Sequence, residues 1–169
     1  FLLAATARGA EEGFIIGATT HFMHQRGQGL ENLRVFREAG LISPRDDSPW
    51  SAWESEPGVY RLTNAMLAEF LERAPELGLV PLQILGYGNR LYDGGGYPKS
   101  PAAIEAFTRY GEHVVIAYRG RCRLYQIWNE WDNETGMAAF RGKGDDRDAA
   151  SYVRLLAAVA PRLKAIDPS

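Results

Sequence analysis

Short apolar runs alternate with longer amphipathic segments along this chain. Four runs of apolar and β-branched residues predict buried strands, at residues 14–20, 41–43, 79–85 and 124–128. Four segments with apolar residues at helical spacing predict helices, at residues 29–39, 64–77, 101–118 and 148–166. About four strand–helix units in succession favour a parallel sheet with right-handed crossovers. The predicted fold class is therefore α/β, either a small open sheet or part of an eight-stranded (β/α)8 TIM barrel.

Local signals mark where several of these elements begin and end. Ser100 followed by Pro101 is a typical helix start, and Gly78 is a typical helix end. Residues 44–58 are rich in charged residues, Pro and Trp, and we expect them to form a long loop. Residues 86–99 are rich in Gly and Tyr and predict a second loop.

The composition indicates one domain without a strongly charged surface. The 169 residues are 46% hydrophobic, which is enough for a core. The net charge is -2, and the Lys and Arg residues are dispersed. Both observations argue against a nucleic-acid partner and against a basic membrane-binding face. The sequence lacks an apolar run of about 18 residues, so we expect no membrane span.

Patterns for a bound metal or cofactor are missing from the sequence. Cys122 is the only cysteine, which excludes an intramolecular disulfide and a cysteine-based metal cluster. His21 and His24 lie close together, but a third ligand at zinc spacing does not accompany them. The turn after the first predicted strand does not have the glycine pattern of a dinucleotide site. We expect neither a metal nor a cofactor.

Residues 1–12 form an N-terminal tail before the predicted domain at residues 13–169. The tail begins with the apolar Phe1-Leu2-Leu3 and continues with small residues, as at the end of a secretory signal peptide. A truncated chain end or a frayed N-terminal segment would have the same appearance. The first interpretation favours a secreted or periplasmic protein.

Polar side chains follow the ends of the predicted strands. The strand at 124–128 is followed by Asn129 and Glu130, and His21, Arg45 and Tyr87 come after the three earlier strands. Catalytic groups collect at the C-terminal ends of strands in parallel barrels, so we expect these residues to open onto one cleft. An acid beside an amide suits sugar chemistry, because the acid can protonate a glycosidic oxygen while the amide binds a ring hydroxyl. Ordinary polar loop residues would give the same local pattern.

A second motif lies within the predicted loop at 44–58. It reads Arg45-Asp46-Asp47, then Trp50, then Glu54, then Gly58-Val59-Tyr60. We expect Arg45 to bridge carboxylates, because a guanidinium pairs well with them. We expect Trp50 to offer a flat face to a sugar ring and Glu54 to anchor the loop rather than to perform chemistry.

The two motifs together resemble the N-terminal half of a clan A glycoside hydrolase. The residues that carry the resemblance are Arg45-Asp46-Asp47, Trp50, Glu54, Gly58-Val59-Tyr60, Ile127-Trp128-Asn129-Glu130 and Leu163-Lys164-Ala165-Ile166-Asp167-Pro168. Within the clan, the chain is most similar to family 39 and to related exopolysaccharide-degrading glycosidases. The similarity covers roughly residues 13–168.

This resemblance implies a (β/α)8 barrel and a retaining hydrolase. Glu130 would then be the general acid/base and Asn129 the group that hydrogen-bonds a substrate hydroxyl. The nucleophile of such enzymes is a second Glu at the end of the seventh strand. Only about four strand–helix units are recognisable here, so we expect this chain to lack the nucleophile. Trp131 departs from the family pattern, which has Pro or another small residue after the acid/base.

Three interpretations therefore stand at the level of sequence. The first is a glycoside hydrolase represented by the first half of its barrel. The second is a non-catalytic carbohydrate-binding or interaction module derived from such a barrel, with stacking surfaces at Trp50, Tyr87, Tyr92 and Trp131. The third is an unrelated α/β domain.

The first interpretation makes two further predictions. The chain alone should not hydrolyse glycosides, because retaining hydrolysis needs two carboxyl groups. The open sheet should expose the apolar side chains Ile15, Leu82 and Ile127, which the other half of the barrel or a second copy of the chain would cover.

Overall fold

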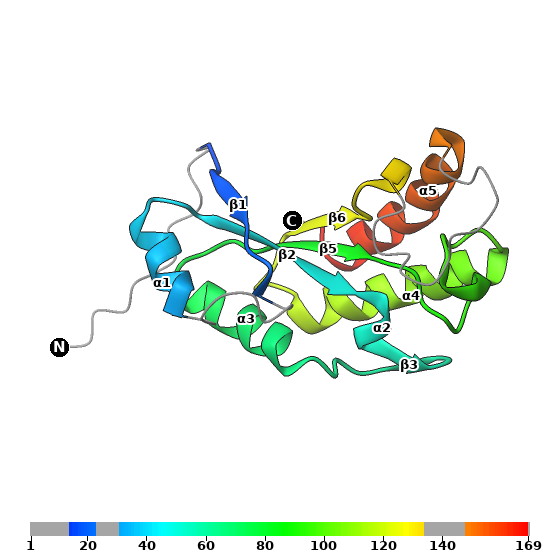
Figure 1. Cartoon of the computed structure of the whole chain (residues 1–169), viewed down its shortest axis with the longest axis horizontal. Helices are drawn as coiled ribbons and strands as arrows, with labels where there is room; N and C mark the ends of the chain where they lie inside the picture. Colours follow the sequence, from blue (N-terminus) through cyan, green and yellow to red (C-terminus); the bar gives the residue numbers. More distant parts are fainter. Residues whose placement is uncertain (1–13, 23–30, 134–147, 169) are drawn as a thin grey trace.

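The centre of the molecule is a four-stranded parallel sheet (Figure 1). The computed structural model describes residues 14–22, 31–133 and 148–168. In spatial order the strands are β1 (Gly17–Thr19), β2 (Ser43–Pro49), β5 (Leu82–Gly86) and β6 (Leu124–Ile127). The order follows the sequence, and each pair is parallel. A sheet built this way needs crossover helices between its strands, and the α/β prediction is confirmed.

Three helices connect successive strands of the sheet, and a fourth follows β6. They are α1 (Glu31–Glu38), α3 (Ala65–Glu76), α4 (Pro101–Tyr118) and α5 (Ala149–Ile166). Figure 1 shows α3 and α4 running below the sheet, and α4 also packs against α5. The core between these layers is rich in aromatic residues, including the fully buried Trp50, Trp128, Tyr110, Phe70 and Phe107.

The three long helices begin at side chains that cap them. Asn64 accepts a hydrogen bond from the Leu67 amide at 2.9 Å, and Ser100 accepts one from Ala103 at 3.1 Å. Asp148 accepts a hydrogen bond from the Ser151 amide at 2.8 Å. Each cap satisfies a backbone N–H that has no partner inside the helix. The predicted helices at 64–77, 101–118 and 148–166 are confirmed to within a residue or two.

The second strand differs from the prediction. A strand at 41–43 followed by a loop was expected, whereas β2 spans Ser43–Pro49 and its polar side chains are mostly buried. Burial is possible because these groups have partners. Asp46 accepts hydrogen bonds from the Phe22 amide and the Thr20 hydroxyl, and the Ser48 hydroxyl accepts one from Trp53 Nε1 at 2.9 Å. Strands β1 and β5 pair with β2 on either side and satisfy its backbone.

The segment after β2 is also ordered, although a loop was predicted. It contains the short helix α2 (Trp50–Trp53) and the hairpin β3 (Glu54–Glu56) and β4 (Val59–Tyr60). Glu54 is fully buried and accepts hydrogen bonds from Trp50 Nε1 at 2.6 Å, the Gly58 amide at 2.7 Å and the Tyr92 hydroxyl at 2.7 Å. The predicted anchoring role of Glu54 is confirmed.

The outermost strands of the described sheet are β1 and β6, and they are covered to different extents. Every residue of β1 is exposed, and the preceding Phe14 is 91% exposed. Ile15 is exposed as predicted, and Leu82 is half-buried. The prediction for Ile127 was wrong, because it points toward α5 and is only 7% exposed. The predicted tail at 1–12 lies outside the described residues. Within the described part of the chain, the helices are too short or too polar to cross a membrane.

Candidate active site

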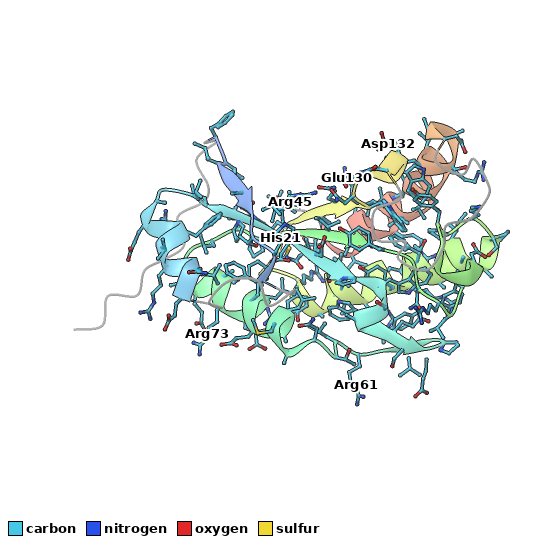
Figure 2. The ribbon with its side chains drawn as sticks, viewed as in Figure 1. His21, Arg45, Arg61, Arg73, Glu130 and Asp132 are labelled. Atoms are coloured by element: carbon cyan, nitrogen blue, oxygen red, sulfur yellow. The ribbon has the colours of Figure 1, made fainter. Side chains whose placement is uncertain are left out.

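Arg45 was expected to follow its strand, but it is the third residue of β2 and connects this strand to β1 and β6. Its Nη2 donates to Asn129 Oδ1 at 2.6 Å, its Nε donates to Gln126 Oε1 at 3.1 Å and its Nη1 donates to Thr19 Oγ1 at 3.2 Å. Figure 2 shows Arg45 and Glu130 on the side of the sheet opposite α3 and α4. All three acceptors are neutral oxygens. We expected Arg45 to bridge carboxylates, but its guanidinium donates to amide and hydroxyl oxygens instead.

Tyr87 directly follows β5, next to β2. Its hydroxyl donates to Asp47 Oδ1 at 2.6 Å. Burial, and then the hydrogen bond to the Asp47 carboxylate, raise the pKa of the Tyr87 phenol above its ordinary value. The phenol is therefore a neutral hydrogen-bonding group at physiological pH.

The backbone turns sharply where β6 ends. Trp128 and Glu130 both have left-handed backbone angles, with φ of 64° and 48°. Such angles are uncommon for residues other than glycine and concentrate at functional sites. Gln126 Nε2 donates to the Trp128 carbonyl at 2.7 Å and supports the turn. Within three residues the chain passes from the buried Trp128 through the half-buried Asn129 to the exposed Glu130.

Of the residues predicted to open onto one cleft, Tyr87, Asn129 and Glu130 follow strands β5 and β6, whereas Arg45 lies within β2. Arg45 donates to Asn129, Tyr87 donates to Asp47, and Glu130 is the next residue after Asn129. His21 is exposed and follows β1, next to the pairing of Thr20 with Arg45. Figure 2 shows the labels of His21, Arg45, Glu130 and Asp132 in a row along the upper side of the sheet.

The predicted stacking role of Trp50 is wrong, because this residue lies in the core. It is 1% exposed, and its ring is stacked against Tyr92 at 5.0 Å and Tyr110 at 6.1 Å between centroids. Tyr92 is half-buried, with one ring face against Trp50 and its hydroxyl on Glu54. An indole covered in this way has no face left for a sugar ring.

Trp131 is also mostly buried. It is 9% exposed and packs against Tyr97 at 4.2 Å and Tyr152 at 5.5 Å between ring centroids. It begins a short 3-10 helix, η3 (Trp131–Asn133), directly after Glu130. Trp131 therefore supports the turn that carries Glu130, and little of its own surface is available to a ligand.

Two hydrogen-bond partners of Arg45 and Tyr87 were not recognised from the sequence as site residues, namely Asp47 and Gln126. Asp47 lies two residues after Arg45 on β2, so their side chains point to the same face. Gln126 pairs in register with Ile84, which pairs with Asp47. Alternation along a strand could have identified Asp47, but only if residues 43–49 had been recognised as a strand.

The described part of the chain holds no group of three or more His, Cys, Asp or Glu residues arranged to bind a metal ion. His24 lies outside the described residues. Cys122 is buried, and burial raises the pKa of its thiol to about 11. This thiol donates to the Pro81 and Leu124 carbonyl oxygens, at the beginning of β5 and β6.

The fold is similar to that of solved glycoside hydrolases. A family 39 glycoside hydrolase from Bacteroides cellulosilyticus aligns over 90% of this chain and 29% of its own, with a TM-score of 0.70 and 21% identity. An endo-β-1,4-mannanase from Thermotoga petrophila aligns over 94% of this chain and 42% of its own (TM-score 0.61, 17% identity). A family 1 β-glucosidase from Thermotoga maritima aligns over 93% and 46% (TM-score 0.62, 15% identity).

No protein-family model matches the sequence, and the comparison with curated proteins finds no match. The chain spans between 29% and 53% of the length of the similar solved structures. At these identities the similarity shows the fold alone. The chain has the parallel α/β architecture of part of a TIM-barrel glycoside hydrolase.

Proposed function

We propose that this chain is the N-terminal half of a retaining glycoside hydrolase, in which Glu130 is the general acid/base. The observation that carries the proposal is the pair of hydrogen bonds from Arg45 to Gln126 and Asn129, next to the exposed Glu130. Glycosidic oxygen is a poor leaving group until it is protonated. Glu130 would supply that proton, and Asn129 would hydrogen-bond a ring hydroxyl of the same sugar.

A retaining reaction also needs a nucleophilic carboxylate roughly 5–5.5 Å from the acid. Asp47 lies on the same face of β2 as Arg45, but its carboxylate accepts the Tyr87 hydroxyl. Asp132 is exposed on η3, beyond Glu130 in the direction of the chain. We therefore assign the nucleophile to the complementary half of the barrel. That carboxylate would attack the anomeric carbon while Glu130 protonates the leaving oxygen, and Glu130 would then deprotonate the water that releases the sugar.

The complementary half would join at β6 and α5. A groove of about 380 Å³ lies there, lined by the apolar Val115, Ile127, Leu156 and Leu163 together with charged residues such as Arg123, Lys164 and Asp167. The outer edge of β6 belongs to the same groove, and a further parallel strand could pair with it while burying the apolar lining. At the opposite edge, β1 and the exposed Phe14, Ile15 and Ile16 would pair with the last strand of the barrel.

The substrate we propose is a polysaccharide or oligosaccharide, with a family 39-like exopolysaccharide as the finer assignment. The Arg-Asp-Asp and Trp-Asn-Glu motifs support family 39, as does the similar fold of one family 39 enzyme. A polymeric substrate of this kind fits a secreted or periplasmic enzyme. The alternative of a carbohydrate-binding module loses two of its four proposed stacking surfaces, because Trp50 and Trp131 are buried.

The test is to assay a complete barrel that contains this chain as its first half. With aryl β-glycosides and β-glycans, Glu130→Gln should lower kcat by a factor of about 10²–10⁴. External azide should partly restore turnover of aryl glycosides, since their good leaving groups need no acid. Asp132→Asn is the matched control, because it removes a nearby exposed carboxylate and should leave kcat within about twofold. Equal effects of the two substitutions would contradict the assignment.

A second experiment tests whether the complementary half of the barrel is the partner of this chain. The chain alone should be inactive, and mixing it with a separately produced complementary half should restore activity and remove the free edge of β6. A Leu156→Glu substitution in the groove should prevent that restoration. Assembly of two copies of this chain at the same groove, measured by light scattering and blocked by Leu156→Glu, would instead identify a second copy as the partner.

A further inference from the structure

We propose that Gln126 is a positioning residue for Glu130, because its amide connects the Arg45 guanidinium to the backbone turn that carries the acid. The inference rests on the proposed function, in which Glu130 protonates the leaving oxygen of the substrate. Gln126 is half-buried and lies within β6, before the turn. Its role in the reaction is exerted through the turn and not through a contact with the substrate.

The orientation of the Gln126 amide is fixed by two partners of opposite kind. A guanidinium has only donors, so Arg45 Nε faces the amide oxygen Oε1, at 3.1 Å. A backbone carbonyl can only accept, so the Trp128 carbonyl faces the amide nitrogen Nε2, at 2.7 Å. Exchanging the two ends of the amide would place donor against donor and acceptor against acceptor. The position therefore needs a side chain that accepts at one end and donates at the other.

The Trp128 carbonyl sets the direction in which the chain leaves β6. The Trp128 N–H donates to the Leu85 carbonyl at 2.7 Å, and the Trp128 ring packs against Tyr97 at 5.1 Å between centroids. With the N–H and the ring held, the freedom that remains is rotation of the peptide plane between Trp128 and Asn129. A peptide bond is planar, so Gln126 fixes this plane by holding its oxygen.

The turn needs this support because its backbone angles are uncommon. Trp128 and Glu130 have φ of 64° and 48°, in the left-handed region that costs free energy for side chains other than glycine. Beyond the turn, the Glu130 carbonyl accepts the Asn133 N–H at 3.0 Å within η3. Glu130 thus lies between the peptide plane that Gln126 holds and a 3-10 turn. A displacement of about 1 Å at this point is enough to weaken proton transfer to the leaving oxygen.

Arg45 holds both amides that matter to the site. Its Nη2 donates to Asn129 Oδ1 at 2.6 Å, and Gln126 Nε2 lies 3.5 Å from the same oxygen. The oxygen of Asn129 therefore faces Arg45, and its NH2 group lies at the opposite end of the amide. One guanidinium in this way sets the hydroxyl-binding amide directly and the acid through Gln126.

The first experiment measures the order of the turn by NMR relaxation in the folded chain. Gln126→Glu keeps the side-chain length and still accepts from Arg45, but a carboxylate cannot donate to the Trp128 carbonyl. The order parameters of the Asn129 and Glu130 backbone amides should fall from about 0.85 toward about 0.6. Gln126→Met should have the same effect without adding a charge, and it serves if Gln126→Glu does not fold.

The matched control is Tyr125→Phe. Tyr125 is the neighbour of Gln126 in β6, so its side chain points to the opposite face, where its hydroxyl donates to the Cys122 carbonyl at 3.2 Å. This variant also loses one hydrogen bond, but it should leave the order of the turn unchanged. Unchanged order parameters in both Gln126 variants, or an equal fall in Tyr125→Phe, would overturn the proposal.

The second experiment compares leaving groups in the complete barrel. The measured quantity is kcat/KM, because it reports the step in which the leaving group departs. Both Gln126 variants should lower it by about 10–100-fold for aryl glycosides with poor leaving groups, which need a well-placed acid. Dinitrophenyl glycosides leave without a proton, so their kcat/KM should stay within about twofold. A purely structural defect would lower both values equally, and that result would overturn the proposal.

The two experiments separate this inference from the proposed function. An inactive barrel whose turn is loosened in the Gln126 variants would reject the proposed function and keep the role of Gln126 in the turn. A barrel whose turnover needs Glu130, but whose Gln126 variants show no dependence on the leaving group, would keep the proposed function and reject this inference.

Discussion

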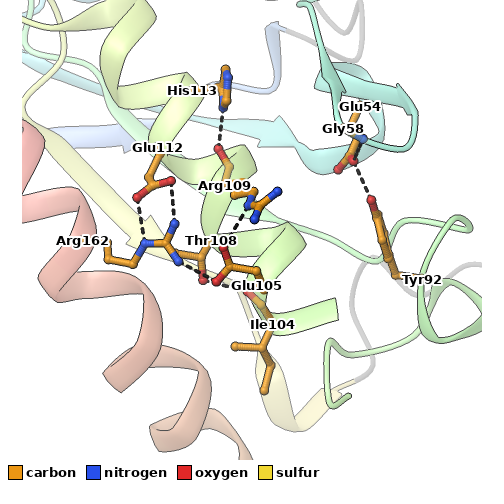
Figure 3. Close-up of polar contacts among 10 residues, drawn as sticks. All are labelled: Glu54, Gly58, Tyr92, Ile104, Glu105, Thr108, Arg109, Glu112, His113 and Arg162. Carbon is orange, nitrogen blue, oxygen red and sulfur yellow. Dashed lines mark hydrogen bonds and ion pairs between the residues drawn. The ribbon is translucent and has the colours of Figure 1, made fainter. Parts of the chain in front are cut away.

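Two arginine-centred clusters in this molecule have different partners. Arg45 donates its three hydrogen bonds to the neutral side chains of Thr19, Gln126 and Asn129. Arg162 on α5 instead lies between two glutamates of α4, as Figure 3 shows. It forms a two-pronged pair with Glu112 at 2.8 and 2.9 Å and a third contact with Glu105 at 2.6 Å.

The partners explain what each arginine can do. The two carboxylates around Arg162 offset its charge and tie α5 to α4, so this cluster stabilises the fold. The described partners of Arg45 are uncharged, so its positive charge remains available to an anionic group that enters the cleft. A nucleophilic carboxylate from the other half of the barrel is such a group. Arg162 therefore stabilises the packing of two helices, whereas we propose that Arg45 takes part in the chemistry of the site.

Conservative replacement of the two arginines should separate these roles most clearly. In the complete barrel, Arg45→Lys should lower kcat/KM by about 100-fold, because a lysine cannot hold Gln126 and Asn129 together and the amide loses its position. Arg162→Lys should change kcat/KM by less than about twofold, because it lies on the helix surface. Protection of Cys122 from alkylation at pH 8 would show that both variants are folded, since the buried thiol has a pKa of about 11. Equal losses of kcat/KM in the two variants would show that the two arginines do not differ in this way.

Removal of the Arg162 side-chain charge should act on stability instead. Arg162→Met should lower the free energy of unfolding by about 1 kcal/mol, because the side chain is 39% exposed and solvent screens its ion pairs. The loss should shrink in 1 M salt. Urea unfolding at low and high salt measures both effects. A loss that does not depend on salt would assign the role of Arg162 to packing of its stem.

The smallest expected effect is a pH dependence at Glu105. Hydrogen bonds from Arg162 and then Arg109 hold the pKa of this glutamate below its ordinary 4.5. Its contribution to stability is therefore present above pH 4.5 and is lost as the pH falls through the lower folded-state pKa. Glu105→Gln should be slightly less stable than the parent chain at pH 7 and equally stable at about pH 2. A constant difference across that range would show that the ion pairs contribute nothing.

Local sequence signals determined the helices and the order of the elements. Asn64, Ser100 and Asp148 cap three helices that were predicted from apolar spacing, since a cap acts within one turn. The apolar runs before Gly86 and Trp128 likewise identified β5 and β6. The placement of Asn129 and Glu130 at a strand end follows from the same local pattern.

Tertiary structure alone decided β2 and the surroundings of the aromatic residues. The segment Ser43–Pro49 is too polar to be recognised as a buried strand, and it forms one because β1, β5 and distant side chains satisfy its polar groups. Trp50 is likewise buried by Tyr92 and Tyr110, which are far from it in the sequence. Whether a polar group or an indole is buried depends on partners that become neighbours only when the chain folds, so no local pattern contains that information.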